Sequence, residues 1–550
     1  MTDIFRKGLE FLLKRQTNIL SAAFIIMSTV ILSQVLGLVK QRLLIAIFGL
    51  SPVGVYFAAS LLPDFLFQAV IGTAISSAFI PVFAHLLSND QKKEAEDTAS
   101  SLLTISLSIF IVLAIILAIF APYILQIMNL GNGFSPDQMV LMTNLMRILL
   151  VAELFFMLGI FFTAVLQTHN HFFIPGMAAA MYNLGIIIGI LALSNYGIYG
   201  PALGNILGAV LFVILQIPIL IKVGFPFKIN FDYKNSGFVK ILHLMWPRSI
   251  ANIVFNVSSI LTVALISFIQ AAGRNYTIFN CAQTLAFAPV TLFGQTIAQA
   301  AFPVLAREKD KLEEFKITFL TSFNQMLYLV LPASVLLLVL RIPIVRLVYG
   351  ANLRFDWPAT VLTGRTLALF SLCIFSESLK ALIARGFYAR HNTKILLFVG
   401  TFATILMLAL SAFFVIFLKL GVMSVAFAYS LSSITELIIL FILLDRHVQG
   451  FDKKFLLTSW TKIFGASFFT AFAIYIPIKL LDQLVFDTTK TINLLLLTGI
   501  SSLIGLSIYF FLTWLFNVKE AQTYLTIIRR LGNWREVMNK QPEVIESTKF

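Results

Sequence analysis

Charged residues are scarce in this chain, and their scarcity excludes an ordinary soluble protein. Only 12% of the 550 residues are Asp, Glu, Lys or Arg, whereas 59% are hydrophobic. A soluble interior cannot hide that much apolar side chain, since charged residues normally make up about a quarter of a globular protein. The composition therefore predicts a protein that lies in a lipid bilayer.

Cysteines, histidines and catalytic motifs are also rare or missing. Both cysteines, Cys281 and Cys373, fall inside apolar runs, which argues against a disulfide framework or a thiolate metal site. The histidines are scattered except for His169 and His171. We find no P-loop, no paired-cysteine motif and no nucleophile elbow. We therefore expect no enzyme, no metal, no cofactor and no ATP-hydrolysing domain, and coupling to Na⁺ or to the membrane potential stays open.

Long apolar runs are what the chain has instead. A spanning helix needs about 20 mostly apolar residues, and fourteen such runs are separated by charged or Gly- and Pro-containing breaks. We predict an all-α polytopic membrane protein with 14 transmembrane helices. Their expected positions are residues 20–47, 55–86, 99–127, 138–167, 172–195, 199–221, 239–271, 276–304, 317–345, 361–389, 395–418, 422–444, 459–480 and 491–516. The first run is too long for a signal peptide and lacks a small-residue cleavage site.

The basic residues indicate the orientation of these spans. If the spans alternate from a cytoplasmic N-terminus, 27 Lys and Arg fall on the cytoplasmic side, 8 on the opposite side and 5 within spans. Cytoplasmic loops carry such an excess of Lys and Arg. We therefore predict that the N- and C-termini are both cytoplasmic, and we attribute the net charge of +15 to topology and not to nucleic acid.

One stretch of sequence occurs twice. Residues 72–85 read GTAISSAFIPVFAH and residues 294–307 read GQTIAQAAFPVLAR, with six identical positions at an offset of 222. The same offset relates His169 to His391, and an offset of 224 relates Gly197 to Gly421. Chance likeness between apolar helices is the alternative, but three concordant landmarks favour an internal duplication.

The duplication predicts the domain organisation. Residues 1–222 and 223–446 would form two six-helix lobes, and two additional helices would follow at 447–517. Because six is an even number, the lobes are parallel repeats, as in carriers whose halves rock about a central cavity. Residues 518–550 are expected to form a cytoplasmic amphipathic tail.

Polar residues inside the spans are the candidates for function, because they are costly in a membrane. In the first span, Lys40 shares a helix face with Ser33 and Gly37, beside Gln34 and Gln41. We expect this polar stripe to face a water-filled cavity and not lipid.

Two cations are the strongest candidates for binding an anionic substrate. Lys40 and Arg248 lie on the first span of each predicted lobe, and such side chains bind phosphate through charge-assisted hydrogen bonds. For each of them, an interhelical hydrogen bond that only holds the bundle is the alternative. The other predicted cavity residues are Asn252, Asn256, Glu153, Glu377 and Lys380. Glu377 and Lys380 stand at i and i+3, so a mutual ion pair is equally expected. Further ionisable residues in spans, without an assigned role, are Arg42, Asp64, Arg147 and Glu436.

Four residues are candidates for a hinge or gate. Proline within a span kinks a helix or leaves carbonyl groups without a partner, which suits bending. The predicted hinge or gate residues are Gly37, Pro63, Pro81 and Pro303.

Several ordered motifs resemble one known family over nearly the full length. They are Ser33-Gln34-Val35-Leu36-Gly37, Leu62-Pro63-Asp64, Ser76 to Phe83, His169 to Pro175, Gln216-Ile217-Pro218, Thr363-Gly364-Arg365 and Gly386 to Arg390. In this respect the chain resembles the MurJ (MviN) family of lipid II flippases, within the multidrug/oligosaccharidyl-lipid/polysaccharide exporter superfamily. It departs from the family pattern in the first span, where Gln34, Lys40 and Gln41 occupy positions that are typically charged.

The resemblance implies a function and a location. It implies a V-shaped cavity between the lobes, a lipid-tail groove beside the last two spans, and movement of the undecaprenyl-pyrophosphate-linked peptidoglycan precursor to the outer leaflet by alternating access. The expected location is the bacterial plasma (inner) membrane, and the expected partners are this precursor, membrane lipids and cell-wall synthesis proteins, for a monomer that binds no nucleic acid. The alternatives are a carrier of another lipid-linked glycan or amphipathic substrate, and a non-transporting scaffold with the same fold.

Overall fold

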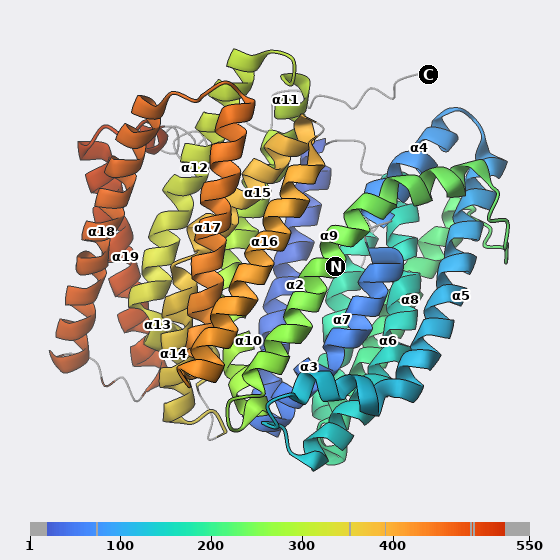
Figure 1. The fold of residues 1–550 in the computed structure, drawn as a ribbon, viewed down its shortest axis with the longest axis horizontal. Coiled ribbons are helices and arrows are strands. Elements are labelled where there is room, and N and C mark those ends of the chain that lie inside the picture. The colour runs from blue at the N-terminus through green and yellow to red at the C-terminus, as the bar shows by residue number, and fades with distance from the viewer. Residues whose placement is uncertain are drawn as a thin grey trace, which may run out of the picture. The chain divides into compact units, whose positions relative to one another are not determined.

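The computed structural model describes residues 19–72, 75–350, 354–390, 392–484, 487 and 490–522, and within them it leaves out the side chains of 19–27, 76–77, 246–252, 255, 455 and 483–484. Every regular element in this part of the chain is helical (Figure 1). Contacts divide the described residues into two compact units, of which unit 1 ends at Arg274 and unit 2 begins at Asn275. Each unit is described by itself.

Unit 1 consists mostly of long helices. They are α2 (Ile19–Phe48), α3 (Leu50–Phe67), α4 (Ile80–Ser88), α5 (Lys92–Ile124), α6 (Pro136–Thr168), α7 (Phe173–Ala192), α8 (Tyr199–Val223) and α9 (Ser236–Ile266), with short π-helical segments η1 (Gln68–Gly72) and η2 (Ile75–Phe79) and 3₁₀ segments η3 (Leu125–Asn129) and η4 (Ser194–Tyr196).

Unit 2 begins within α10 and has the same all-helical character. Its elements are α10 (Ala272–Pro289), the π-helical η5 (Val290–Gln295), α11 (Thr296–Arg307), α12 (Leu312–Val339), α13 (Arg341–Val348), α14 (Trp357–Ser371), α15 (Ile374–Ala389), α16 (Thr393–Ala412), the π-helical η6 (Phe413–Phe417), α17 (Met423–His447), α18 (Lys453–Leu484) and α19 (Thr491–Leu515).

The prediction of a membrane-spanning helical protein is confirmed, but the predicted number of 14 spans is not. Within the described residues, 12 helices are long and apolar enough to cross a membrane, and α14 with α15 makes a thirteenth if that pair, bent by 41°, is one span. The remaining predicted span corresponds to α9, which is 31 residues long but has central side chains outside the described set.

Glycines bring α7 and α8 into close contact in unit 1. A Cβ atom placed on Gly185 would lie 2.3 Å from Cα of Gly208, and one on Gly189 would lie 2.4 Å from Cα of Gly204. Small residues at helix interfaces let backbones approach closely in a membrane, where no hydrophobic force drives helices together. This interface fixes the helices that carry several buried polar side chains of the candidate site.

Within unit 2, aromatic side chains pack the last two helices against α12. Phe323 of α12 stacks on Trp460 of α18 at 5.3 Å between ring centroids. On the other side, the Tyr509 hydroxyl of α19 donates a hydrogen bond to the Tyr328 carbonyl of α12 at 2.7 Å. The two helices predicted as an addition at 447–517 therefore pack against α12.

The contacts group α9 with unit 1, although the sequence repeat places it in the second lobe. The Thr98 hydroxyl of α5 donates to the Asn235 side chain at the start of α9, and the Gly131 amide donates to the Ser267 hydroxyl at its end, at 2.8 Å. Because both ends of α9 are tied to α5 and to the loop after it, the contact boundary falls one helix later than residue 222. The lobe boundary derived from the repeat stays a prediction.

Candidate functional site

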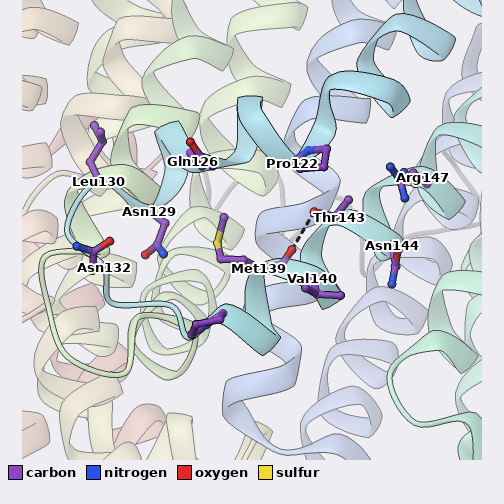
Figure 2. Close-up of a pocket in the computed structure, with 11 residues that line it drawn as sticks. Pro122, Gln126, Asn129, Leu130, Asn132, Met139, Val140, Thr143, Asn144 and Arg147 are labelled. Carbon is purple, nitrogen blue, oxygen red and sulfur yellow. Dashed lines mark hydrogen bonds between the residues drawn. The ribbon is translucent and has the colours of Figure 1, made fainter.

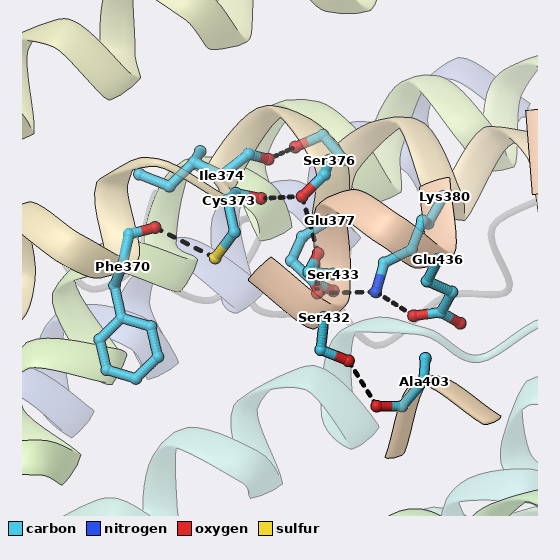
Figure 3. Close-up of polar contacts among 11 residues, drawn as sticks. Phe370, Cys373, Ile374, Ser376, Glu377, Lys380, Ala403, Ser432, Ser433 and Glu436 are labelled. Atoms are coloured by element: carbon cyan, nitrogen blue, oxygen red, sulfur yellow. Dashed lines mark hydrogen bonds and ion pairs between the residues drawn. The ribbon is translucent and has the colours of Figure 1, made fainter. Parts of the chain in front are cut away.

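Unit 2 contains a buried ion cluster built around one lysine (Figure 3). Lys380 Nζ lies 2.8 Å from Glu377 Oε1 on its own helix, α15, and 2.5 Å from Glu436 Oε2 on α17. The three side chains are only 15–19% exposed. The ion pair expected from the i, i+3 spacing is thus confirmed, and a second carboxyl group, from Glu436, joins it.

Hydroxyl groups complete this cluster. Ser433 of α17 donates a hydrogen bond to Glu377 Oε1 at 2.7 Å, and Ser376 lies 2.7 Å from the Ser433 hydroxyl. Figure 3 shows these serines and Glu377 forming a continuous line towards Lys380. A buried carboxylate is tolerated in a membrane when such donors and a cation surround it.

The bend between α14 and α15 explains the position of Glu377. α15 begins again at Ile374 after the break, and Glu377 lies in its first turn. The start of a helix carries a partial positive charge, which favours a carboxylate there. A discontinuous span is also how many transporters place helix ends at membrane depth.

Unit 1 contains a similar group of one lysine and two acidic residues. The Asp64 side chain of α3 interacts electrostatically with Lys40 of α2 and with Glu153 of α6. Glu153 is buried, with 8% exposure. Lys40 therefore has a carboxyl group as a partner within its own unit, an interaction that sequence reasoning left out when it assigned Lys40 to phosphate.

A buried asparagine lies at the centre of a second polar network in unit 1. Asn205 of α8 donates to the Tyr56 hydroxyl of α3 at 2.5 Å and accepts from the Tyr182 hydroxyl of α7 at 2.9 Å. Asn205 is 5% exposed. The network joins three helices around the Glu153 and Asp64 side chains, which interact electrostatically with both tyrosines.

The predicted polar stripe on α2 is divided between two environments. Ser33 accepts a hydrogen bond from the Asn183 side chain of α7 at 3.2 Å, so this part of the stripe packs against protein. Gln41 is buried, whereas Gln34 is exposed and Lys40 is half-buried. Only part of the stripe is therefore open to a cavity or to the membrane.

The predicted partner of Lys40 falls outside the described side chains. Arg248 and Asn252 belong to α9, but their side chains are among those left out, and Asn256 is half-buried on the same helix. The pairing of Lys40 with Arg248 on a pyrophosphate stays a prediction.

The hinge candidates lie next to irregular helical segments. Pro81 is the second residue of α4, which directly follows η2, and Pro303 lies inside α11, which follows η5. The two copies of the repeated stretch thus both adjoin a π-helix, a feature that is frequent at functional sites. Pro63 is buried inside α3, and a Cβ atom on Gly37 would meet nothing within 4 Å.

Sequence reasoning missed the partners more often than the central residues. Glu436, Asp64, Ser433, Asn205 and the tyrosines were not assigned a role. One signal was available, because Glu153 and Glu377 are separated by 224 residues, the offset that relates Gly197 to Gly421. Aligning the acidic residues of both halves on that offset would have pointed to one acidic centre in each half.

Two all-helical units with many helices long and apolar enough to cross a membrane, one bent helix pair and buried charged groups are features of a multi-pass membrane transporter. The family model "Lipid II flippase MurJ" matches residues 44–509, and the chain belongs to that family. The family consists of transporters and not of enzymes.

Relatives and solved structures agree with this assignment. The chain is 26% identical over 410 residues to a probable lipid II flippase MurJ of Buchnera aphidicola subsp. Acyrthosiphon pisum, covering 73% of this chain and 79% of the relative. It is also 26% identical over 463 residues to the lipid II flippase MurJ of Thermosipho africanus, covering 84% and 91%.

The fold likeness extends to a wider superfamily. The structure of a lipid II flippase MurJ in an inward closed conformation aligns with a TM-score of 0.72 and 24% identity, covering 88% of this chain and 99% of that chain. An inward-facing multidrug resistance MATE family transporter of the MOP superfamily aligns with a TM-score of 0.63 and 14% identity, covering 78% and 98%. At these identities the matches establish the fold.

Proposed function

We propose that this protein is a lipid II flippase, which moves the undecaprenyl-pyrophosphate-linked peptidoglycan precursor from the inner to the outer leaflet of a bacterial plasma membrane. The observation that carries the proposal is the family match, which runs over residues 44–509 and so includes most of both predicted lobes. Fourteen spans with cytoplasmic termini are part of the proposal, and the excess of basic residues on one side is consistent with an even number of spans.

The proposed mechanism is alternating access. Lys40 and Arg248 would help to hold the pyrophosphate, with Gln34, Gln41, Asn252 and Asn256 as further polar contacts. The π-helical segments beside Pro81 and Pro303 would be the points of bending. Coupling to a Na⁺ gradient, to the membrane potential or to another protein is part of the proposal.

A leaflet-accessibility assay tests the proposal directly. Purified protein is reconstituted into vesicles that contain lipid II, and the fraction of lipid II open to an added membrane-impermeant reagent is measured over time. We expect the protein to expose the inner-leaflet pool, while vesicles without protein keep it protected. Equal protection in both samples would reject the flippase proposal.

One observation favours a second candidate, an exporter of amphipathic cations. Each cluster pairs a single lysine with two acidic residues, and carboxyl groups suit a cationic substrate better than a pyrophosphate. The same vesicles distinguish the candidates, because a cation exporter would move a fluorescent lipophilic cation and leave lipid II in place.

A further inference from the structure

The ion cluster of unit 2 lies where secondary transporters commonly hold a coupling ion. Glu377 is in the first turn of α15, directly after the bend that separates this helix from α14. Glu436 lies at the middle of α17, which runs from Met423 to His447. In many such transporters, discontinuous helices near the bilayer midplane hold the substrate or the coupling cation. The position of the cluster is therefore that of a cation site.

The oxygen atoms of the cluster also suit a small cation. Two carboxyl groups, one from α15 and one from α17, face the same point (Figure 3). The Ser433 hydroxyl is bonded to one of them, Glu377 Oε1, at 2.7 Å. Na⁺, like other hard cations, takes oxygen ligands. By ligand type alone, this group of side chains would be a candidate for the Na⁺ coupling that the sequence leaves open.

The ammonium group of Lys380 already occupies this point. Its Nζ lies 2.8 Å from Glu377 Oε1 and 2.5 Å from Glu436 Oε2, and Figure 3 shows it in contact with both carboxyl groups. A Na⁺ ion bound by the same two oxygens would lie next to this ammonium group and be repelled by it. Because Lys380 is part of α15, its charge cannot dissociate as a bound ion does.

Backbone carbonyls near the cluster, the other oxygen ligands for Na⁺, have partners within the protein. The Ala403 carbonyl of α16 accepts a hydrogen bond from the Ser432 hydroxyl of α17 (Figure 3). The Cys373 carbonyl at the helix break accepts one from the Ser376 hydroxyl at 2.8 Å. These hydrogen bonds occupy lone pairs that a metal ion would need.

Arg147 of unit 1 shows the opposite arrangement (Figure 2). Its exposed side chain lines a cavity of about 750 Å³ between α5 and α6. Its Nε donates at 3.0 Å to the Ala118 carbonyl, which Pro122 leaves without a helical partner. Among the described residues it has no carboxylate partner, so mobile ions can approach its charge. Lys380, in contrast, is 15% exposed and lies against its counter-charges.

We propose that Lys380 is a built-in cation that takes the place of a dissociable Na⁺ in unit 2, so that this cluster binds no coupling ion. The consequence for coupling rests on the proposed transport function, because the driving force would then act on another part of the protein. The occupancy of the cluster does not depend on which substrate is moved.

Thermal unfolding of the purified full-length protein tests this proposal, in NaCl and in choline chloride at equal ionic strength. For Lys380→Ala we expect the unfolding temperature to be about 2 °C or more higher in NaCl, beyond any difference in the wild type, because Na⁺ fills the vacated position and stabilises the folded state. The matched control Lys479→Ala removes an exposed cation from α18 and should respond like the wild type.

A second carboxyl variant makes the test specific. Adding Glu436→Gln to Lys380→Ala removes one of the two carboxylates and should abolish most of the gain in NaCl. The proposal is overturned if Lys380→Ala responds to Na⁺ like the wild type, or if the wild type has a Na⁺ response that Glu436→Gln alone abolishes. Where Lys380→Ala does not fold, the wild type and Glu436→Gln decide, and equal responses support the proposal. Flipping is not measured, so a failure here is distinct from a failure of the flippase proposal.

Discussion

Replacing Lys380 by methionine should destabilise the protein far more than neutralising Glu436. Lys380→Met leaves Glu377 and Glu436 facing each other, largely buried, without the ammonium group that separates them. Glu436→Gln leaves a balanced pair of Lys380 with Glu377, and the glutamine still accepts a hydrogen bond from Lys380. The two variants therefore test whether charge compensation holds α15 to α17.

The expected magnitudes follow from the distances. At 2.8 Å and 2.5 Å, each lysine–carboxylate attraction is about 6–7 kcal/mol at an effective dielectric constant near 20. Most of this attraction is offset by the several kcal/mol needed to remove each ion from water. Removing the shared cation nevertheless leaves two buried charges, which costs about 3–5 kcal/mol. For Glu436→Gln we expect about 1 kcal/mol or less, as one neutral hydrogen bond replaces an ion pair.

Chemical or thermal unfolding of purified protein in detergent measures both effects. The triple variant Glu377→Gln, Lys380→Met, Glu436→Gln is the decisive control, because removing all three charges together should recover most of the stability lost in Lys380→Met. If Glu436→Gln is as damaging as Lys380→Met, or if the triple variant is the least stable of the three, charge compensation is not what stabilises this cluster.

Three more perturbations probe close packing, the buried network and function. Gly54→Ala would place Cβ 1.7 Å from the Gly273 carbonyl oxygen and should lower the free energy of unfolding by about 2 kcal/mol or more. The control Gly465→Ala, whose Cβ would meet nothing within 4 Å, should leave the stability unchanged or slightly raise it. Equal unfolding temperatures for the two variants would contradict the close approach of Gly54 to Gly273. Asn205→Ala removes the partner of the buried Tyr56 hydroxyl and of the half-buried Tyr182 hydroxyl. It should cost about 2–3 kcal/mol in the same assay, against about 1 kcal/mol for Tyr182→Phe. Lys40→Ala should fail to support growth of a flippase-depleted strain at normal membrane abundance, and full growth would reject its substrate role.

Patterns within single segments made the helices predictable. Apolar runs of about 20 residues have one stable solution in lipid, because every backbone polar group must be satisfied within the segment. The ion pair of Glu377 with Lys380 was also predictable from the sequence, since residues three apart on a helix lie on the same face. What local patterns could not supply was the third member, Glu436, which is 56 residues away from Lys380.

The candidate site in unit 1 shows the same limit. The sequence identified Lys40 and Glu153 as unusual residues in spans, but it could not pair Lys40 with Asp64, because that interaction depends on how α2, α3 and α6 pack. Arg147 was recognised as an ionisable residue and given no role. Its connection to Pro122 appears only when α6 lies against α5, with the proline-freed carbonyl of Ala118 within reach.

The sequence by itself determined that this is an all-helical membrane protein and predicted an internal duplication, since composition, run length and repeat offset are properties of the chain read in order. Only the tertiary structure decided which buried charges compensate one another and where α9 belongs by contact. The physical reason is that a charge in a membrane is stabilised by groups within a few ångströms, and helix packing brings those groups together from distant parts of the sequence.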